Sequence, residues 1–193
     1  MAQLGCANVY LMSKRITLLT GPPGAGKGTQ AGLIADSLDW HAFSVGAILR
    51  DTASPDIKVI MNSGKLLPAE EVVELVIKEI EESDRPALVD GFPRRLDQAI
   101  EFDAKAQEMG WPTAQVVFLA IDKSQSWSRL LKRGRDDDAR AAWEERWREY
   151  EEKTLEAVEH YRGTGRLIEI DGSGDIETVH KLIEKELNAP EDR

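Results

Sequence analysis

The stretch Gly21-Pro22-Pro23-Gly24-Ala25-Gly26-Lys27-Gly28-Thr29-Gln30 has the glycine, lysine and threonine spacing of a phosphate-binding loop. A β-rich run, 15–20 (RITLLT), precedes it, and a helix is expected to begin near Gly28. Glycines let successive backbone N–H groups turn towards an anion, and the helix N-terminus adds partial positive charge. Lys27 then sets a full charge against the phosphates. A Gly/Pro-rich turn with an incidental lysine is the alternative, which the spacing and the strand-to-helix context disfavour.

Outward from this loop, short apolar runs alternate with longer amphipathic stretches. Strands are expected at Arg15–Thr20, Ala87–Asp90, Gln115–Ala120 and Arg166–Ile170, with a weaker candidate at Trp40–Ser44. Helices are expected at Gly28–Asp39, Ala69–Glu82, Leu96–Met109, Ser124–Gly134, Ala139–Tyr161 and Asp175–Leu187. Continuous apolar runs suit strands that are buried on both faces. The pattern therefore predicts an α/β fold with a mainly parallel sheet, whose ligands bind beyond the carboxyl ends of the strands.

Composition narrows the classes of protein. The 193 residues carry 25 Lys and Arg against 35 Asp and Glu, a net charge of −10. This balance argues against nucleic acid or an anionic membrane as partner, although a local arginine cluster could still bind a small polyanion. Cys6 is the single cysteine, which excludes an internal disulfide and a cysteine-built metal site. No apolar run approaches the ~20 residues of a membrane helix. We expect a cytoplasmic monomer.

The two ends are expected to lie outside the organised domain, which spans 14–188. Residues 1–13 are interpreted as an N-terminal extension, because no basic residues precede their mildly apolar stretch as they would in a signal peptide. The tail 189–193 is polar and contains Pro190, so it is expected to be flexible.

A second motif, Val89–Arg94 (VDGFPR), ends a predicted strand. Asp90 suits a role in holding Mg²⁺-bound water, since Mg²⁺ keeps several waters and takes few protein carboxylates. Gly91 permits close approach of the backbone, and Pro93 fixes the turn that presents Arg94 to a phosphate. For Asp90 alone, a helix-capping role is the alternative.

Basic residues form a third group further along the chain. Ser128–Asp138 (SRLLKRGRDDD) contains Arg129, Arg133 and Arg135, and Arg146 follows in Glu144–Tyr150 (EERWREY). The alternative is a highly charged, solvated pair of helices that is laced with Glu–Arg contacts.

In this order, the run GAGKGTQ, the motif VDGFPR and the arginine group resemble the nucleoside monophosphate kinases of the adenylate kinase and UMP/CMP kinase type. The resemblance extends from Lys14 to about Leu187. It implies a P-loop NTPase-type five-stranded parallel sheet flanked by helices, with a monophosphate-binding insert at 44–65 and a short lid at 134–146. The implied activity is reversible phosphoryl transfer from Mg·ATP to a nucleoside monophosphate. No cysteine tetrad is present, so a zinc-bearing lid is not expected.

The resemblance also implies a role for individual residues. Mg²⁺ is assigned to Thr29 and, through water, to Asp90. The implied ATP-binding residues are Gly24, Ala25, Gly26, Lys27, Gly28, Thr29, Arg133 and Gly174. The implied acceptor-binding residues are Val45, Arg50, Lys65, Leu66, Leu67, Gly91, Phe92, Pro93, Arg94, Gln98, Arg135 and Arg146. The implied catalytic residues, which neutralise charge in the transition state, are Lys27, Arg94, Arg129, Arg133, Arg135 and Arg146.

AMP is the expected acceptor because Gln98 matches the glutamine that hydrogen-bonds adenine in adenylate kinases. Val45 stands where those kinases usually carry threonine, and Ala47 replaces their usual acidic residue. UMP or CMP is therefore the alternative acceptor. The short lid and Val45 also leave open a catalytically weak, nucleotide-binding regulatory protein.

Overall fold

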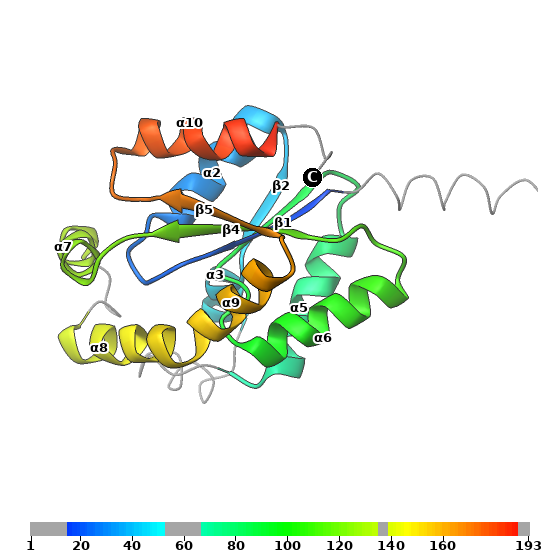
Figure 1. Ribbon diagram of the computed structural model, residues 1–193, viewed down its shortest axis with the longest axis horizontal. Helices are drawn as coiled ribbons and strands as arrows, with labels where there is room; N and C mark the ends of the chain where they lie inside the picture. The colour runs from blue at the N-terminus through cyan, green and yellow to red at the C-terminus, as the bar shows by residue number, and fades with distance from the viewer. Residues whose placement is uncertain (1–14, 53–66, 135–138, 189–193) are drawn as a thin grey trace, which may run out of the picture.

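Five parallel strands form the central sheet of the computed structural model, which describes residues 15–52, 67–134 and 139–188. The strand order is β2-β3-β1-β4-β5 (Figure 1). The strands are β1 (Ile16–Thr20), β2 (His41–Ser44), β3 (Ala87–Asp90), β4 (Gln115–Ala120) and β5 (Leu167–Asp171). Every pairing is parallel. The predicted five-stranded parallel sheet is thus confirmed.

Helices cover both faces of this sheet. They are α2 (Lys27–Leu38), α3 (Val45–Thr52), α5 (Ala69–Glu81), α6 (Leu96–Glu108), α7 (Lys123–Arg133), α8 (Arg140–Glu149), the π-helical turn η1 (Tyr150–Thr154), α9 (Leu155–Gly163) and α10 (Ile176–Leu187). In Figure 1, α2 and α10 lie above the sheet, and α5, α6 and α9 lie below it. Within the described ranges, no helix combines the length and the apolar character that crossing a membrane requires.

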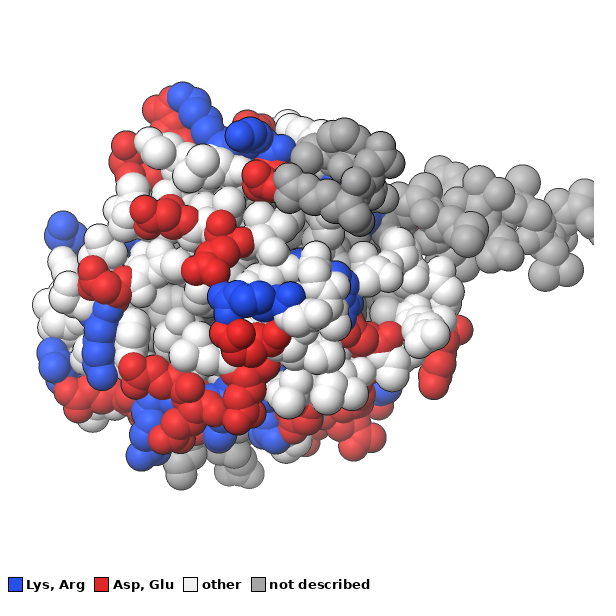
Figure 2. Space-filling view, viewed as in Figure 1, with Lys and Arg blue, Asp and Glu red and all other residues white. Residues whose placement is uncertain are grey.

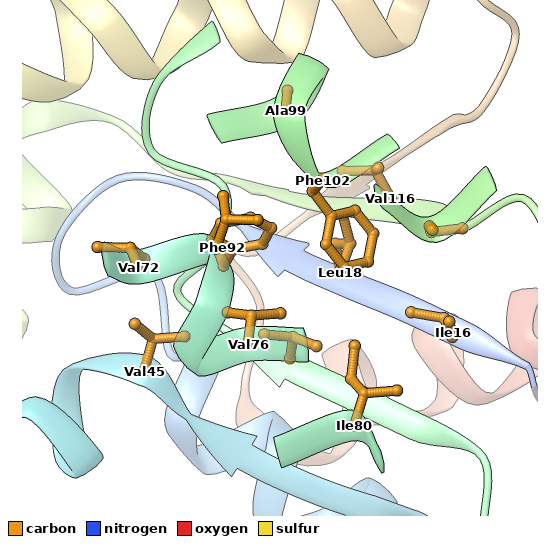
Figure 3. Packing of buried hydrophobic residues seen from close by; sticks show 14 of the residues in the cluster. Ile16, Leu18, Val45, Val72, Val76, Ile80, Phe92, Ala99, Phe102 and Val116 are labelled. Atoms are coloured by element: carbon orange, nitrogen blue, oxygen red, sulfur yellow. The ribbon is translucent and has the colours of Figure 1, made fainter. Parts of the chain in front are cut away.

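Strand β1 shows why its sequence is apolar throughout. Leu18 packs on the α5–α6 side with Val76 and Phe102 (Figure 3). Its neighbour Leu19 joins the cluster on the opposite face, which includes Ile34 of α2. Successive side chains of a strand point to opposite faces, so a strand between two helical layers needs apolar residues at every position. Each fully buried leucine contributes about 1.5–3 kcal/mol to stability.

Two helical segments differ from the prediction. The sequence predicts one helix over Ala139–Tyr161, but the structure divides it into α8, η1 and α9. A π-helical turn widens the helix by one residue per turn, which apolar spacing does not reveal. Helix α3 is also absent from the predicted set. Its eight residues are too few to set a clear period of apolar positions.

Charge is unevenly distributed over the surface. On the face seen in Figure 2, Asp and Glu side chains gather along the lower edge, among Lys and Arg. Several surface acids of α8 and α10 form ion pairs with neighbours on the same helix, such as Glu145 with Arg148 and Glu177 with Lys181. The net negative charge of the chain therefore reflects acids on exposed helix faces. It does not determine the sign of the charge in a cleft.

Candidate functional site

A cleft of about 1350 Å³ opens beyond the carboxyl ends of the strands. The loop after β1, the start of α3, the end of β3, α7, α8, η1 and the start of α10 all contribute to its lining. Thirteen of the sequence-predicted site residues line it: Gly24, Ala25, Gly26, Lys27, Gly28, Thr29, Arg50, Asp90, Arg94, Arg129, Arg133, Arg146 and Gly174. Segments distant in sequence thus meet where a parallel sheet places its ligands.

The phosphate-loop glycines allow tight packing of this loop. Gly24 has φ +77°, and a Cβ at this position would lie 2.8 Å from the backbone oxygen of Ser126 in α7. Only glycine satisfies both the conformation and the contact. Helix α2 then begins at Lys27 with Gly26 as its N-cap and no capping side chain. Its first backbone N–H groups are therefore available to an anion in the cleft.

Lys27 projects back over its own loop. Its ammonium donates hydrogen bonds to the carbonyl oxygens of Gly21 and Pro22, each at 2.8 Å. Burial lowers the pKa of Lys27 to about 8, and the carboxylate of Asp90 opposes that fall. Three further positive charges also lower it: Arg94, Arg133 and Arg146. This concentration of positive charge in one cleft favours binding of a polyanion.

Arg94 lies in the turn that follows β3, where its Nε donates to the carbonyl oxygen of Gly91 at 2.9 Å. Burial is the main cause that lowers the pKa of Arg94, Asp90 opposes it, and the charges of Arg146 and Arg50 add to it. A Cβ built on Gly46 would lie 3.4 Å from Nη1 of Arg50 and 3.6 Å from Nη2 of Arg94. The two guanidinium groups therefore converge over the start of α3.

The backbone around Arg94 is hydrogen-bonded from three separate elements. Thr20 Oγ1, at the end of β1, donates to the carbonyl oxygen of Pro93 at 2.9 Å. Thr154 Oγ1, in η1, donates to that of Arg94 at 3.0 Å. Gln98 Oε1, in α6, accepts from the Arg94 backbone N–H at 2.8 Å. Hydrogen bonds thus hold the backbone N–H of Arg94 and the carbonyl oxygens of both Pro93 and Arg94.

Arg129 lies on α7 and contacts backbone carbonyl oxygens. Its Nη2 donates to that of Gly172 at 2.8 Å, and at 3.2 and 3.3 Å to those of Ser173 and Gly174. Its Nη1 lies 3.5 Å from the carbonyl oxygen of Ala25. Arg129 therefore joins the phosphate loop to the turn between β5 and α10, which contains Gly174, one of the residues that the sequence resemblance assigns to ATP binding.

Some predicted acceptor-site residues lie behind the cleft. Val45 and Phe92 belong to the hydrophobic cluster below the sheet (Figure 3), and Leu67 joins them. The backbone of Gly91 and Pro93 and the Gln98 side chain are buried and are outside the cleft lining. Lys65, Leu66 and Arg135 lie outside the described residues, as do parts of the predicted insert and lid.

Sequence reasoning missed three cleft residues that come from the end of α8 and from η1: Glu149, Tyr150 and Thr154. No local motif marks them. However, positions three, four and eight residues after Arg146 share its side of a helix, and this spacing could have indicated them. Burial raises the pKa of Tyr150 to about 12, and its ring stacks on Phe118 with the centroids 6.5 Å apart.

Two oxygen-bearing side chains of the cleft have the chemistry that Mg²⁺ prefers. Asp90 is 7% exposed at the end of β3, and the hydroxyl of Thr29 lies in the first turn of α2. A Cβ at Gly28 would be 3.3 Å from Asp90 Oδ2, so the carboxylate lies against the start of α2. The donor set therefore fits a Mg²⁺ ion that keeps water and phosphate as its other ligands.

Comparison with known proteins agrees with this geometry. The family model described as "Adenylate kinase" matches residues 19–166. An adenylate kinase of Synechococcus sp. (strain CC9311) is 38% identical over 178 residues, which cover 89% of this chain and 97% of that protein. One from Prochlorococcus marinus (strain MIT 9211) is 36% identical over 183 residues, covering 91% of this chain and 98% of the relative.

A relative from a different bacterial genus gives the same result. The adenylate kinase of Rhizobium meliloti (strain 1021) is 36% identical over 186 residues, covering 87% of this chain and 97% of its own. The range that the family model matches includes the phosphate loop, β3 and the arginine-bearing helices α7 and α8 of the cleft. The chain belongs to the adenylate kinase family.

Proposed function

We propose how this chain, as a member of the adenylate kinase family, carries out its reaction: reversible transfer of the terminal phosphate of ATP to AMP, which gives two ADP. The observation that carries the proposal is the convergence of Lys27, Arg94 and Arg146 on one cleft. Burial is the main cause that lowers the pKa values of Lys27 and Arg94, and the nearby charge of Arg146 lowers both further. Phosphoryl transfer needs positioning and neutralisation of charge more than covalent chemistry.

On the donor side, the backbone N–H groups of 24–29 and the ammonium of Lys27 bind the ATP phosphates. Arg133, at the end of α7, adds a further positive charge, and the turn that contains Gly174 contacts the ATP base. In the free protein the Lys27 ammonium is bonded to Gly21 and Pro22. Phosphate oxygens therefore take over from carbonyl oxygens, and the more negative partner favours the charged lysine.

On the acceptor side, Arg50 and Arg94 bind the phosphate of AMP. Arg146, on α8, faces the same space and neutralises charge on the transferred group. Arginine suits these positions because its planar fork meets phosphate oxygens in a bidentate way. The acceptor phosphate is already ionised, so no side chain is required as a general base.

We assign Mg²⁺ to Thr29 and, through water, to Asp90. When bound, the ion neutralises charge on the ATP phosphates. The carboxylate of Asp90 also offsets part of the positive charge on Lys27 and Arg94, as the direction of its effect on both pKa values indicates. Asp90 thereby supports a dense cationic cluster in the absence of nucleotide.

The cytoplasm is the proposed location and a monomer the proposed state. AMP is favoured as acceptor by the names of the relatives and by the match at Gln98. UMP or CMP is the second candidate, on the observation that Val45 is buried in the core and carries no hydroxyl.

A coupled assay of ADP formation from ATP, with AMP, UMP, CMP or GMP as acceptor, tests the proposal. We expect AMP to give the highest kcat/KM. A higher kcat/KM with UMP or CMP would show that this nucleotide, and not AMP, is the preferred acceptor. Transfer to none of the four despite ATP binding would support the nucleotide-binding regulatory alternative. Arg94→Ala should lower kcat/KM for AMP by at least about 10²-fold, since it removes a charge from the transition state.

A further inference from the structure

The segment formed by α8 and η1 carries Arg146 and is hydrogen-bonded near both ends to the two nucleotide sites. Near its start, the buried Trp143 donates from Nε1 to Ser126 Oγ at 2.9 Å. The hydroxyl of Ser126 in turn donates to the carbonyl oxygen of Pro23 at 2.7 Å. This two-step relay runs from α8 through α7 into the phosphate loop.

At the end of the same segment, Thr154 makes the second connection. Its hydroxyl donates to the carbonyl oxygen of Arg94 at 3.0 Å, across 60 positions in the sequence. Thr154 is 4% exposed and Ser126 is 0% exposed, so neither bond is exchanged readily for one to water. Arg146 lies between these anchors, three residues after Trp143 and eight before Thr154.

The segment between Arg146 and Thr154 has an unusual helix geometry. η1 is a π-helical turn, a form that occurs mostly as single turns inside α-helices and frequently at functional sites. It brings both Tyr150 and Thr154 to the cleft lining. Lys153 of the same turn forms an ion pair at 2.7 Å with Glu149, the last residue of α8.

We propose that Ser126 and Thr154 are positioning residues that fix Arg146 between the phosphate loop and Arg94. They touch no reacting atom, and they act by holding the backbone of the groups that do. Catalytic groups lose effectiveness steeply when displaced, because a misplacement of about 1 Å can cost about 10²-fold in rate. The inference rests on the proposed roles of Arg94 and Arg146. Its test therefore includes variants of these arginines as well as variants of the two hydroxyl residues.

The first arm of the test removes the hydroxyl of Thr154. Thr154→Val retains the shape of the side chain and leaves the Arg94 carbonyl oxygen without this donor. We expect kcat/KM for AMP to fall about tenfold with KM for ATP unchanged, and Thr154→Ser to restore most of the activity. The control is Thr164→Val at an exposed threonine outside the cleft lining, whose hydroxyl donates to the carbonyl oxygen of Tyr161 and accepts from Arg166 Nε.

The second arm addresses the relay. Ser126→Ala leaves the Trp143 N–H without its acceptor and the Pro23 carbonyl oxygen without its donor. We expect KM for ATP to rise and kcat to fall, each several-fold. Trp40→Phe is the control, because it removes the N–H of another buried tryptophan from the opposite helical layer. All variants are compared well below their Tm, so that a loss of stability alone cannot change kcat.

A double-mutant cycle shows whether Thr154 and Ser126 act through Arg146 or independently of it. If Arg146→Ala lowers kcat, Thr154→Val and Ser126→Ala should lose most of their effect in that background. Unchanged kinetics of both hydroxyl variants, with a large loss in Arg146→Ala, would overturn this inference and leave the proposed function standing. No loss in Arg146→Ala or Arg94→Ala would overturn the proposed roles of the arginines themselves.

Discussion

The ammonium of Lys27 donates a hydrogen bond to the carbonyl oxygen of Gly21 at 2.8 Å, so the Lys27 side chain is bound to the backbone of its own phosphate loop. If Lys27 binds the ATP phosphates as we propose, nucleotide binding exchanges these hydrogen bonds for hydrogen bonds to phosphate oxygens. The buried ammonium is also a cost to the free protein, as its lowered pKa indicates.

Replacement of this lysine by methionine should separate activity from stability. Lys27→Met removes the charge that meets the ATP phosphates, so we expect turnover to fall by at least about 10²-fold. The free protein should be as stable as the parent or more so, because a buried charge is removed. Steady-state kinetics and thermal unfolding measure the two effects. Lys181→Met is the control at an exposed ion pair, and near-normal turnover of Lys27→Met would contradict the assigned role.

The pKa of Lys27 predicts two opposite pH dependences. Above about pH 8 the free protein loses the charge on Lys27, so ATP should bind about tenfold more weakly at pH 9 than at pH 7. Between about pH 8 and 10.5 the unfolded chain binds more protons at this group than the folded chain does. Its contribution to the free energy of unfolding therefore rises with pH in that window.

ATP titration and urea unfolding of the free protein, each from about pH 7 to 9.5, measure these dependences. Lys27→Met should remove the Lys27 contribution from both profiles. An ATP affinity that stays constant across this range would show that the Lys27 ammonium remains charged, against the expectation from its burial.

Gly28 and Gly32 lie on the same helix and offer a matched pair. A Cβ at Gly28 would be 3.3 Å from Asp90 Oδ2, whereas one at Gly32 meets nothing within 4 Å. Gly28→Ala should displace the carboxylate by a few tenths of an ångström and raise the Mg²⁺ concentration needed for half-maximal turnover. Gly32→Ala should stabilise the protein by about 0.5–1 kcal/mol with unchanged kinetics. Identical Mg²⁺ titrations for both variants would argue against a role of Asp90 near the ion.

Arg129 should influence ATP more than AMP. Arg129→Met leaves the carbonyl oxygens of 172–174 without their shared donor, so we expect KM for ATP to rise about tenfold and KM for AMP to stay within about twofold. Arg148→Met, which breaks an exposed ion pair with Glu145, should change neither. A loss of kcat with unchanged KM for ATP would instead favour direct contact of Arg129 with the transferred phosphate.

The sequence predicts most of the strands and both nucleotide motifs because each is a contiguous run of residues. The loop at 21–30 and the turn at 89–94 have local signatures, and the carboxyl ends of parallel strands bring them together. The contacts of Ser126 and Thr154 were not predictable in this way, because each joins elements about 60 or 100 positions apart. The π-helical turn was missed for a related reason, since one inserted residue hardly changes the apolar spacing.

Gln98 illustrates how a backbone contact limits what a side chain can recognise. Its Oε1 already accepts the N–H of Arg94, which leaves one further lone pair on Oε1 and the two protons on Nε2 for other partners. Adenine N1 and cytosine N3 carry a lone pair at the matching edge, whereas uracil N3 and guanine N1 carry a hydrogen. If Gln98 contacts the base, the hydrogen bond that holds the backbone of Arg94 for the phosphate also fixes the orientation of the amide towards the base.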